Sequence, residues 1–517
     1  MRKNTYIIAG LISSVFLMTG CADSFLEVES KTQETIDTYF TTDEHVQEAV
    51  VAAYAPLHWT DWDGNQYSPV LQASDIMADD LWVGAASKTD QAHLHLSANY
   101  EAVPTNCIQN IWNTAYKGVK RCNDVLTYIG WAGENLTKES ATYYEAQARV
   151  LRVFYYTWLW KFYGNIPYYE ANLTSPYLTE QFQADAVYNA MVVDLEGAIA
   201  LNALPMREES KNYGRVTLAM AYMLYAEIVM YQNDDSRYTT ALKYMTDIIN
   251  SGKYDLVDNY AGIFRESGEW STESIFEINY KDDQATRNYT DNVFVAGGTV
   301  LPTMMGPDGW VDGTDGHNNG WGTFPVRTET YNMYSDEDTR RDGTCWNAAA
   351  AGTYNSRYQD TGFFLEKYTA HTGDNADCSN DPQVNYNNNF RIYRFSETLL
   401  NAAELIVRNA GSGDAKEYLN RVRKRAGLTT ELEPTVDNII EERHLEFVGE
   451  GKRYWDLVRT GKASIVLVPD EYGYRTNTWS INKKYLPIPQ SAIDSAQGSL
   501  TQNNYYCLLY TSPSPRD

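Results

Sequence analysis

Hydrophobic residues return at helical spacing over much of the chain. Apolar side chains that recur every three or four residues form one stripe along one face of a helix. The segments with this pattern include residues 44–59, 107–129, 142–163, 184–204, 217–231, 238–251, 393–409, 414–426 and 436–460. Helix dominates the prediction, and we expect a mainly α fold.

Three of these segments have the lengths of helices in stacked antiparallel hairpins. Residues 184–204, 217–231 and 238–251 follow one another through short connections, as helices do in tetratricopeptide repeats. The strict 34-residue consensus is absent, so the similarity is one of architecture only. We predict a scaffold of tetratricopeptide-like helical hairpins.

Residues 253–389 differ from this scaffold in texture. The region is rich in Gly, Asn, Asp, Tyr and Trp and has no sustained period, although 274–280 could form a short strand. Such a long irregular stretch inside a compact unit is usually functional. We expect a loop-rich insertion with short strands and, because no linker-like composition appears, a single domain over residues 21–506.

The N-terminus has the order of a signal peptide. Arg2 and Lys3 precede an apolar stretch of about 12 residues, shorter than the roughly 20 that span a membrane. The stretch ends in LMTGC, which resembles the lipobox of bacterial lipoproteins. We expect residues 1–20 to be removed and Cys21 to carry the lipid anchor; an ordinary signal peptide is the alternative.

The other cysteines and the C-terminus add few constraints. Cys107 and Cys122 fall in one predicted helix, about 22 Å apart at 1.5 Å per residue, so they cannot pair. Cys345 and Cys378 could form a disulfide in an exported protein. The spacing is not zinc-like, and we expect no metal and no cofactor. Residues 507–517, CLLYTSPSPRD, look like a translated sequencing adapter and are excluded from the fold prediction.

Charge and aromatic content narrow the class of ligand. The net charge of -26 argues against nucleic acid, which requires a basic face. The 41 Tyr and 13 Trp exceed what a soluble protein can readily bury. Because the negative face of an aromatic ring suits the weakly positive C–H groups of a pyranose, this composition favours sugar binding.

Short blocks in a fixed order carry a family resemblance. They include FLEV at 25–28, EAQARVLR at 145–152, KFYGNIP at 161–167, YGRVT at 213–217, RIYR at 391–394, GKRYWDL at 451–457 and YLPIP at 485–489. Together they resemble the SusD/RagB family of nutrient-binding lipoproteins. Residues 504–506 depart from the Pro-Gly-Tyr that ends this family's pattern.

The resemblance implies a location, a partner and a mechanism. Members sit on the outer face of the outer membrane above a TonB-dependent transporter of the SusC type. They bind an oligosaccharide and deliver it as a hinged lid. Capture of peptides or other nutrients by the same mechanism is an alternative.

Two clusters are candidates for the ligand site. In the first, acidic and indole side chains alternate without a helical or strand period; its residues are Trp59, Thr60, Asp61, Trp62, Asp75, Asp79, Asp80, Trp82 and Lys88. The resemblance places ligand contacts over residues 75–88, which favours Asp79, Asp80 and Trp82. The second comprises Trp310, Trp321, Tyr280, Tyr289 and Arg287, and glycines beside both tryptophans leave the rings poorly shielded. We predict that at least two of Trp82, Trp310 and Trp321 face the ligand; the alternative is that they anchor loops to the core.

Catalysis is not expected. A glycosidase requires two carboxylates about 5–9.5 Å apart across one sugar, and no feature singles out such a pair among 68 acidic residues. The motifs of zinc proteases, serine hydrolases and phosphate-binding loops are absent. A purely structural partner of the transporter is the other alternative to a binding protein.

Overall fold

The computed structural model describes residues 35–64, 66–283, 287–290, 294, 297–311 and 316–508. Its longer helices are α3 (Asp43–Tyr54), α6 (Asn110–Ala132), α7 (Lys138–Tyr163), α8 (Ala184–Ala200), α9 (Leu218–Gln232), α10 (Tyr238–Asn250), α15 (Phe395–Val407), α16 (Ala415–Arg425) and α17 (Val436–Phe447). The mainly α prediction is confirmed. Within the described part of the chain, no helix is both long and apolar enough to span a bilayer.

Shorter helices connect these elements. They are α2 (Ile36–Tyr39), α4 (Val70–Asp75), α5 (Ala92–Ala98), α11 (Leu301–Met305), α12 (Thr328–Asn332), α13 (Arg340–Thr344), α14 (Ala348–Ala351), α18 (Arg453–Arg459), α19 (Ala463–Val466), α20 (Gln490–Ser495) and α21 (Asn504–Leu508). The predicted lipidation residue Cys21 and the adapter-like residues 509–517 lie outside the described residues.

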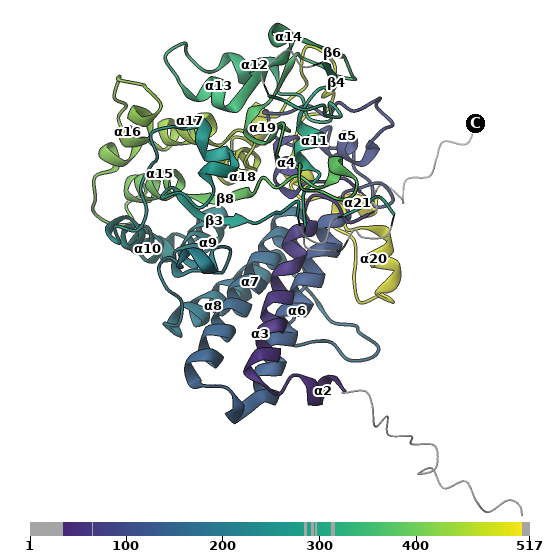
Figure 1. Ribbon diagram of the computed structural model, residues 1–517, viewed down its shortest axis with the longest axis vertical. Helices are drawn as coiled ribbons and strands as arrows, with labels where there is room; N and C mark the ends of the chain where they lie inside the picture. The colour runs from purple at the N-terminus through teal and green to yellow at the C-terminus, as the bar shows by residue number, and fades with distance from the viewer. Residues whose placement is uncertain are drawn as a thin grey trace, which may run out of the picture.

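The helices stack on their neighbours along the chain. α6 packs on α7, α7 on α8, α9 on α10, and α15 on both α10 and α16. In Figure 1, α3, α6, α7 and α8 form the lower part of the molecule, and α11 to α14 lie in the upper part. Threonine caps fix several helix starts; the Thr137 hydroxyl, for example, accepts from the Ser140 amide before α7.

Several boundaries differ from the prediction, and three of them bear on the fold. Cys107 lies before α6, so its distance from Cys122 is not set by one helix, and both remain free thiols. Residues 393–394 belong to a strand. The predicted helix over 436–460 is two helices, α17 and α18, because Gly451 adopts a φ of +72° between them and donates its amide to the Asp75 carboxylate.

Among the residues that the structure describes, eight short strands form four antiparallel pairs. The pairs are β1 (Ile166–Pro167) with β2 (Gln181–Phe182), β3 (Ser274–Ile278) with β8 (Phe390–Arg394), β4 (Asp308–Val311) with β6 (Thr353–Asn355), and β5 (Cys345–Asn347) with β7 (Phe363–Leu365). The β3–β8 pair joins the two borders of the loop-rich region. Between these borders lie the short strands β4 to β7 and irregular segments, which confirms the prediction. Cys345 in β5 and Cys378 are free thiols and do not form the disulfide considered from sequence.

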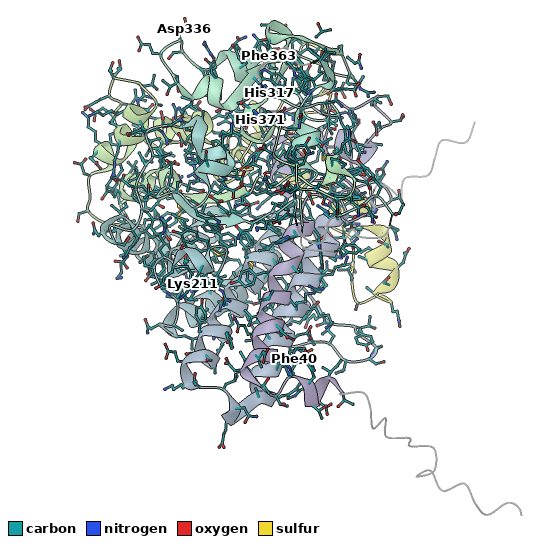
Figure 2. All side chains as sticks on the ribbon, viewed as in Figure 1. Phe40, Lys211, His317, Asp336, Phe363 and His371 are labelled. Carbon is teal, nitrogen blue, oxygen red and sulfur yellow. The ribbon has the colours of Figure 1, made fainter. Side chains whose placement is uncertain are left out.

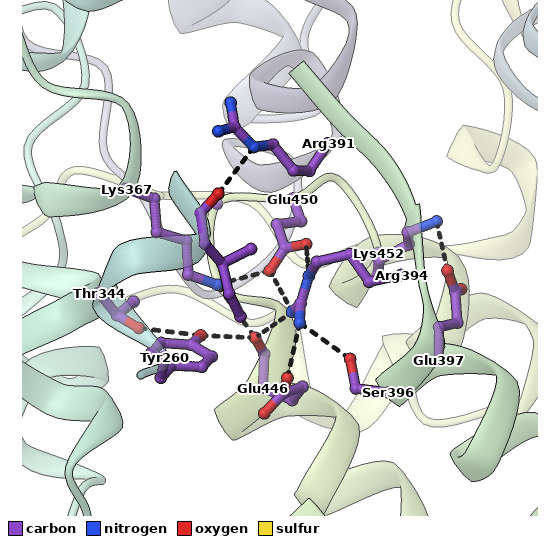
Figure 3. Close-up of polar contacts among 12 residues, drawn as sticks. Tyr260, Thr344, Lys367, Arg391, Arg394, Ser396, Glu397, Glu446, Glu450 and Lys452 are labelled. Carbon is purple, nitrogen blue, oxygen red and sulfur yellow. Dashed lines mark hydrogen bonds and ion pairs between the residues drawn. The ribbon is translucent and has the colours of Figure 1, made fainter. Parts of the chain in front are cut away.

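A buried ionic network joins β8 to the following helices (Figure 3). The Arg394 guanidinium donates to Glu446 at 2.8 Å and to Glu450 at 2.7 Å, and Lys367 donates to Glu450 at 2.7 Å. Arg394 also binds Glu273, just before β3, at 2.6 Å. Buried charges require such pairing because each unpaired ion costs several kcal/mol. The RIYR block therefore belongs to the core.

Candidate functional site

Four aromatic rings form a row in which each ring contacts the next. They are Tyr289, Trp62, Tyr67 and Trp321, and we call them the aromatic face. The centroids of Tyr289 and Trp62 are 6.0 Å apart. Trp62 stacks on Tyr67 at 5.2 Å, and Tyr67 meets Trp321 edge-on at 5.3 Å. Trp62 and Tyr67 are near each other in the chain, but Tyr289 and Trp321 come from the loop-rich region, so only the fold brings the four rings together.

Exposure decides which of these rings can meet a ligand. The Tyr289 side chain is 41% exposed, Tyr67 and Trp321 are half-buried, and Trp62 is buried. Trp62 follows the 3-10 helix η2 (Ala55–Trp59) and pairs with Tyr67 through an antiparallel bridge. Trp62 is therefore the floor of the aromatic face, and the other three rings form its open surface.

A fully buried ion pair holds the floor in place. The Arg287 guanidinium donates to both Asp61 oxygens at 2.9 Å and to the Trp62 carbonyl at 2.7 Å. It also lies 5.2 Å from the Trp62 ring centroid. The Thr299 hydroxyl and the Val300 amide donate to Asp61 at 2.7 and 2.9 Å. Arg287 is thus placed beneath the rings as a support, away from solvent.

Tyr280 also lies beneath the surface. Its side chain is buried, and its ring centroid is 5.4 Å from that of His58. Burial raises the pKa of Tyr280, so its hydroxyl stays protonated. The ring also packs against Phe390, with centroids 4.9 Å apart, and offers no open surface for a sugar.

Polar groups line the edge beside Tyr289. Its hydroxyl donates to the exposed Gln383 side chain at 3.2 Å, and its amide donates to Asp381 at 3.0 Å. Burial raises the pKa of Tyr289 to about 12, so the hydroxyl can act as a donor at neutral pH. The 3-10 helix η9 (Pro382–Val384) supplies these groups. Sequence reasoning missed Asp381 and Gln383, since a polar turn resembles any other loop.

Residues 79–82 of the first predicted cluster lie in the interior, whereas Trp62, which the same cluster included, is the floor of the aromatic face. Trp82 is 2% exposed, and the Arg327 guanidinium stacks on it 3.8 Å from the ring centroid. Asp80 is buried and accepts from His444 at 2.6 Å. Asp79 is half-buried and forms a two-bond pair with Arg453. These contacts tie the segment after α4 to α17 and α18, and they leave no open ring face for a sugar.

Trp310 is also in the interior. It is 7% exposed, lies edge-on to Trp346 at 4.6 Å and packs with Ala348 and Phe364. Gly352 allows this packing, because a Cβ there would lie 2.4 Å from the Trp310 ring. Of the three tryptophans singled out from sequence, Trp321 alone belongs to the aromatic face. We expected at least two of the three to face the ligand, but Trp82 and Trp310 are both buried.

A groove of about 610 Å³ lies next to the aromatic face. Asp63, one residue after Trp62, lines it and accepts from Gln66 and Asn113. The other lining residues are Trp112, Tyr116, Lys117, Lys120, Tyr169, Asn172, Leu173, Tyr177 and Phe294. Sequence reasoning missed this groove because two of its rings, Trp112 and Tyr116, come from α6, where helical spacing predicts core positions.

Two family models together match most of the described chain. A family model described as "SusD family" matches residues 209–506, and one described as "Starch-binding associating with outer membrane" matches residues 65–218. The "SusD-like protein P25" of Formosa agariphila is 23% identical over 526 residues, covering 93% of this chain and 95% of the relative.

Solved structures are similar over nearly the same length. Surface glycan-binding protein A from Bacteroides thetaiotaomicron is 65% identical with a TM-score of 0.88, covering 90% of this chain and 100% of that one. The same protein in complex with laminarihexaose is 65% identical with a TM-score of 0.87 and the same coverage.

Proposed function

Because this chain belongs to the SusD family, as its sequence blocks predicted, we propose that it binds glycan chains at the surface of the outer membrane. The ligand site of this proposal is the aromatic face. The unit that carries it is the single domain expected over residues 21–506.

The observation that carries the proposal is the open surface of Tyr289, Tyr67 and Trp321. A pyranose stacked on one ring gains an amount comparable to an aromatic pair, about 0.5–1.5 kcal/mol beyond area burial. Asp381 and Gln383 stand beside the rings, where carboxylate and amide groups can bind sugar hydroxyls. Three such platforms give weak capture, in roughly the micromolar to millimolar range. A protein that must release its ligand to a transporter requires affinity of this order.

The ligand class that we propose is a laminari-oligosaccharide. The support is the 65% identity to a glycan-binding protein whose structure was solved with laminarihexaose. In finer detail, we propose that Cys21 carries a lipid anchor. We also propose that the protein acts as the lid of a SusC-like TonB-dependent transporter and delivers the glycan to it. A Cys21→Ala protein should then bind glycan normally in solution but fail to support growth on it.

We also propose that the protein does not cleave the glycan. The side chains of the aromatic face are suited to stacking, and the Asp381 carboxylate is already engaged by the Tyr289 amide. Purified protein incubated with laminarihexaose should leave the chain length unchanged by mass spectrometry. Shorter products that persist after repurification would contradict this part.

Isothermal titration with laminarihexaose tests the proposed site. Tyr289→Ala and Trp321→Ala should each weaken binding by about 2- to 10-fold, since each removes one platform. The double variant should lose more than either single variant. Trp131→Ala is the matched control, because Trp131 is 43% exposed at the end of α6 and lies outside the aromatic face.

The outcomes separate function from site. Unchanged affinity in the double variant would move the site elsewhere, with the groove lined by Trp112 and Tyr116 as the next place to test. No binding by the parent to laminarihexaose, to maltohexaose or to a broader glycan panel would remove the glycan proposal and favour peptide capture or a structural role.

A further inference from the structure

Two imidazoles and one carboxylate meet in the loop-rich region, and none of the three residues belongs to the aromatic face. His317 Nε2 lies 2.8 Å from one Glu366 oxygen, and His371 Nε2 lies 3.6 Å from the other. One donor atom from each of the three side chains lies within 4.8 Å of the others. Figure 2 shows the two histidines close together in the upper part of the molecule. We propose that His317, Glu366 and His371 bind a divalent transition-metal ion of the zinc class.

The distances between donor atoms suit such an ion. A tetrahedral Zn²⁺ with bonds of about 2.0–2.1 Å separates its ligand atoms by about 3.3 Å. The 2.8 and 3.6 Å separations run to different Glu366 oxygens, Oε2 and Oε1, so both imidazoles reach one oxygen only after small side-chain rotations. One donor atom from each side chain already lies within 4.8 Å of the others. Three protein ligands leave the fourth position for water. Imidazole and carboxylate donors favour zinc and its neighbours over Mg²⁺ or Ca²⁺, which prefer all-oxygen sites.

The backbone holds the two histidines opposite each other without help from an ion. His317 and His371 form an antiparallel bridge, and hydrogen bonds flank it on both sides. The Asn318 amide donates to Ala370 at 2.7 Å, and the Thr372 amide donates to Gly316 at 2.8 Å. The ligands are therefore preorganised, which lowers the entropy cost of binding.

The surroundings orient the proposed ligands. The Trp346 ring stacks on His317 with centroids 3.8 Å apart and planes within 5°. Arg265 pairs with one oxygen of Glu366, which leaves the other oxygen directed at His317. Its positive charge opposes a cation, but outer partners of this kind fix the orientation of a ligating carboxylate. The side chains are 8% exposed at His317 and 17% at His371, so an ion would enter from the His371 side.

Metal binding here would clamp two loops together. One loop runs from His317 to Trp321, whose amide donates to Thr303 at 2.7 Å; the other contains Glu366 and His371. An ion that joins them stabilises the native state by mass action and not the unfolded chain. The clamp would thus hold the segment that leads into the aromatic face.

Zinc titration of the full chain tests this site. After chelator treatment and its removal, ZnCl₂ should bind the parent with one site by calorimetry and raise its Tm, whereas MgCl₂ should not. His371→Ala should weaken zinc binding by more than the roughly 10- to 100-fold that losing an outer partner costs. His317→Gln should do the same. His45→Ala is the matched control, because His45 lies in α3 at the far end of the molecule.

Each result decides the matter. Zinc binding that is lost in both site variants and kept in His45→Ala supports the assignment. Absence of zinc binding by the parent overturns it, and so does zinc binding that survives in both site variants. Circular dichroism of the less buried variant, His371→Ala, separates loss of the ligand from loss of the fold. A Tm increase of equal size with MgCl₂ would also overturn the assignment.

Discussion

Asp61 and Arg287 together determine where the Trp62 ring stands. Both side chains are fully buried, and three donors from the loop-rich region reach the Asp61 carboxylate: Arg287 Nη1, the Thr299 hydroxyl and the Val300 amide. Two buried charges are tolerated here because each pairs with the other and because the Trp62 carbonyl, the Thr299 hydroxyl and the Val300 amide add hydrogen bonds, although Arg287 Nε has no partner among the described residues. At this scale, the ligand surface depends on a pair that no ligand touches.

Asp61→Asn should destabilise the protein by roughly 3–5 kcal/mol, because it leaves the Arg287 charge buried without its partner. Denaturant unfolding measures this free energy. Asp336→Asn is the control: Asp336 also pairs with an arginine, but its side chain is fully exposed, so unfolding should stay close to that of the parent. A destabilisation of Asp61→Asn no larger than that of the control would contradict the supporting role.

His444 gives the molecule a defined dependence on pH. Burial alone lowers the pKa of His444, but the Asp80 carboxylate at 2.6 Å more than offsets this and raises it above 6.5. The folded state therefore holds the proton more tightly than the unfolded chain. The resulting stability is fully present below pH 6.5 and is lost as pH rises through the raised pKa.

Unfolding free energies measured at pH 6 and at pH 9 test this sign. The stability difference between the parent and His444→Gln should shrink at the higher pH. In Asp80→Asn, which removes the charge that raises the pKa, the same histidine should contribute no such trend. A difference that grows with pH would contradict the pairing.

Residue chemistry alone could not separate surface tryptophans from core tryptophans. Trp321 and Trp310 both follow glycine, yet Trp310 is covered by Trp346 and Phe364 and Trp321 is half-open. Trp82 is covered by Arg327, whose position is fixed only in the folded chain. The proposed metal site could not be predicted for the same reason, because His317 and Glu366 are 49 positions apart and form no motif.

The helices were predictable because their period is local. The start of α8 agrees with the prediction, and the ends of α7 and α10 agree within a residue or two, since Gly164 and Gly252 follow those ends. The break between α17 and α18 was missed because the apolar period continues across it. Gly449 and Gly451 were a usable signal: both adopt positive φ, which favours glycine.

Gly451→Ala should destabilise the protein far more than Gly461→Ala. The two glycines have φ of +72° and +73°, so the backbone cost of about 1–2 kcal/mol is shared. Only at Gly451 would the new Cβ meet backbone, 2.9 Å from Leu71 Cα; at Gly461 nothing lies within 4 Å. Overpacking of this kind adds about 1–3 kcal/mol. Thermal unfolding of both variants measures the difference, and equal losses would contradict the close contact.

At the scale of the whole molecule, the helical scaffold and the loop-rich region have different tasks. The scaffold presents Trp62 and Tyr67 after α3 and η2, and the loop-rich region supplies Tyr289 and Trp321. The ionic network around Arg394 and Glu446 fixes the two parts to each other (Figure 3). The aromatic face exists only where these parts meet, which explains why no single stretch of sequence contained it.

A crystal structure of the protein with laminarihexaose tests the central claim most directly. We expect sugar rings against Tyr289, Tyr67 and Trp321, with hydroxyls near Asp381 and Gln383. Glycan bound only in the groove lined by Trp112 and Tyr116, with the aromatic face bare, would contradict it.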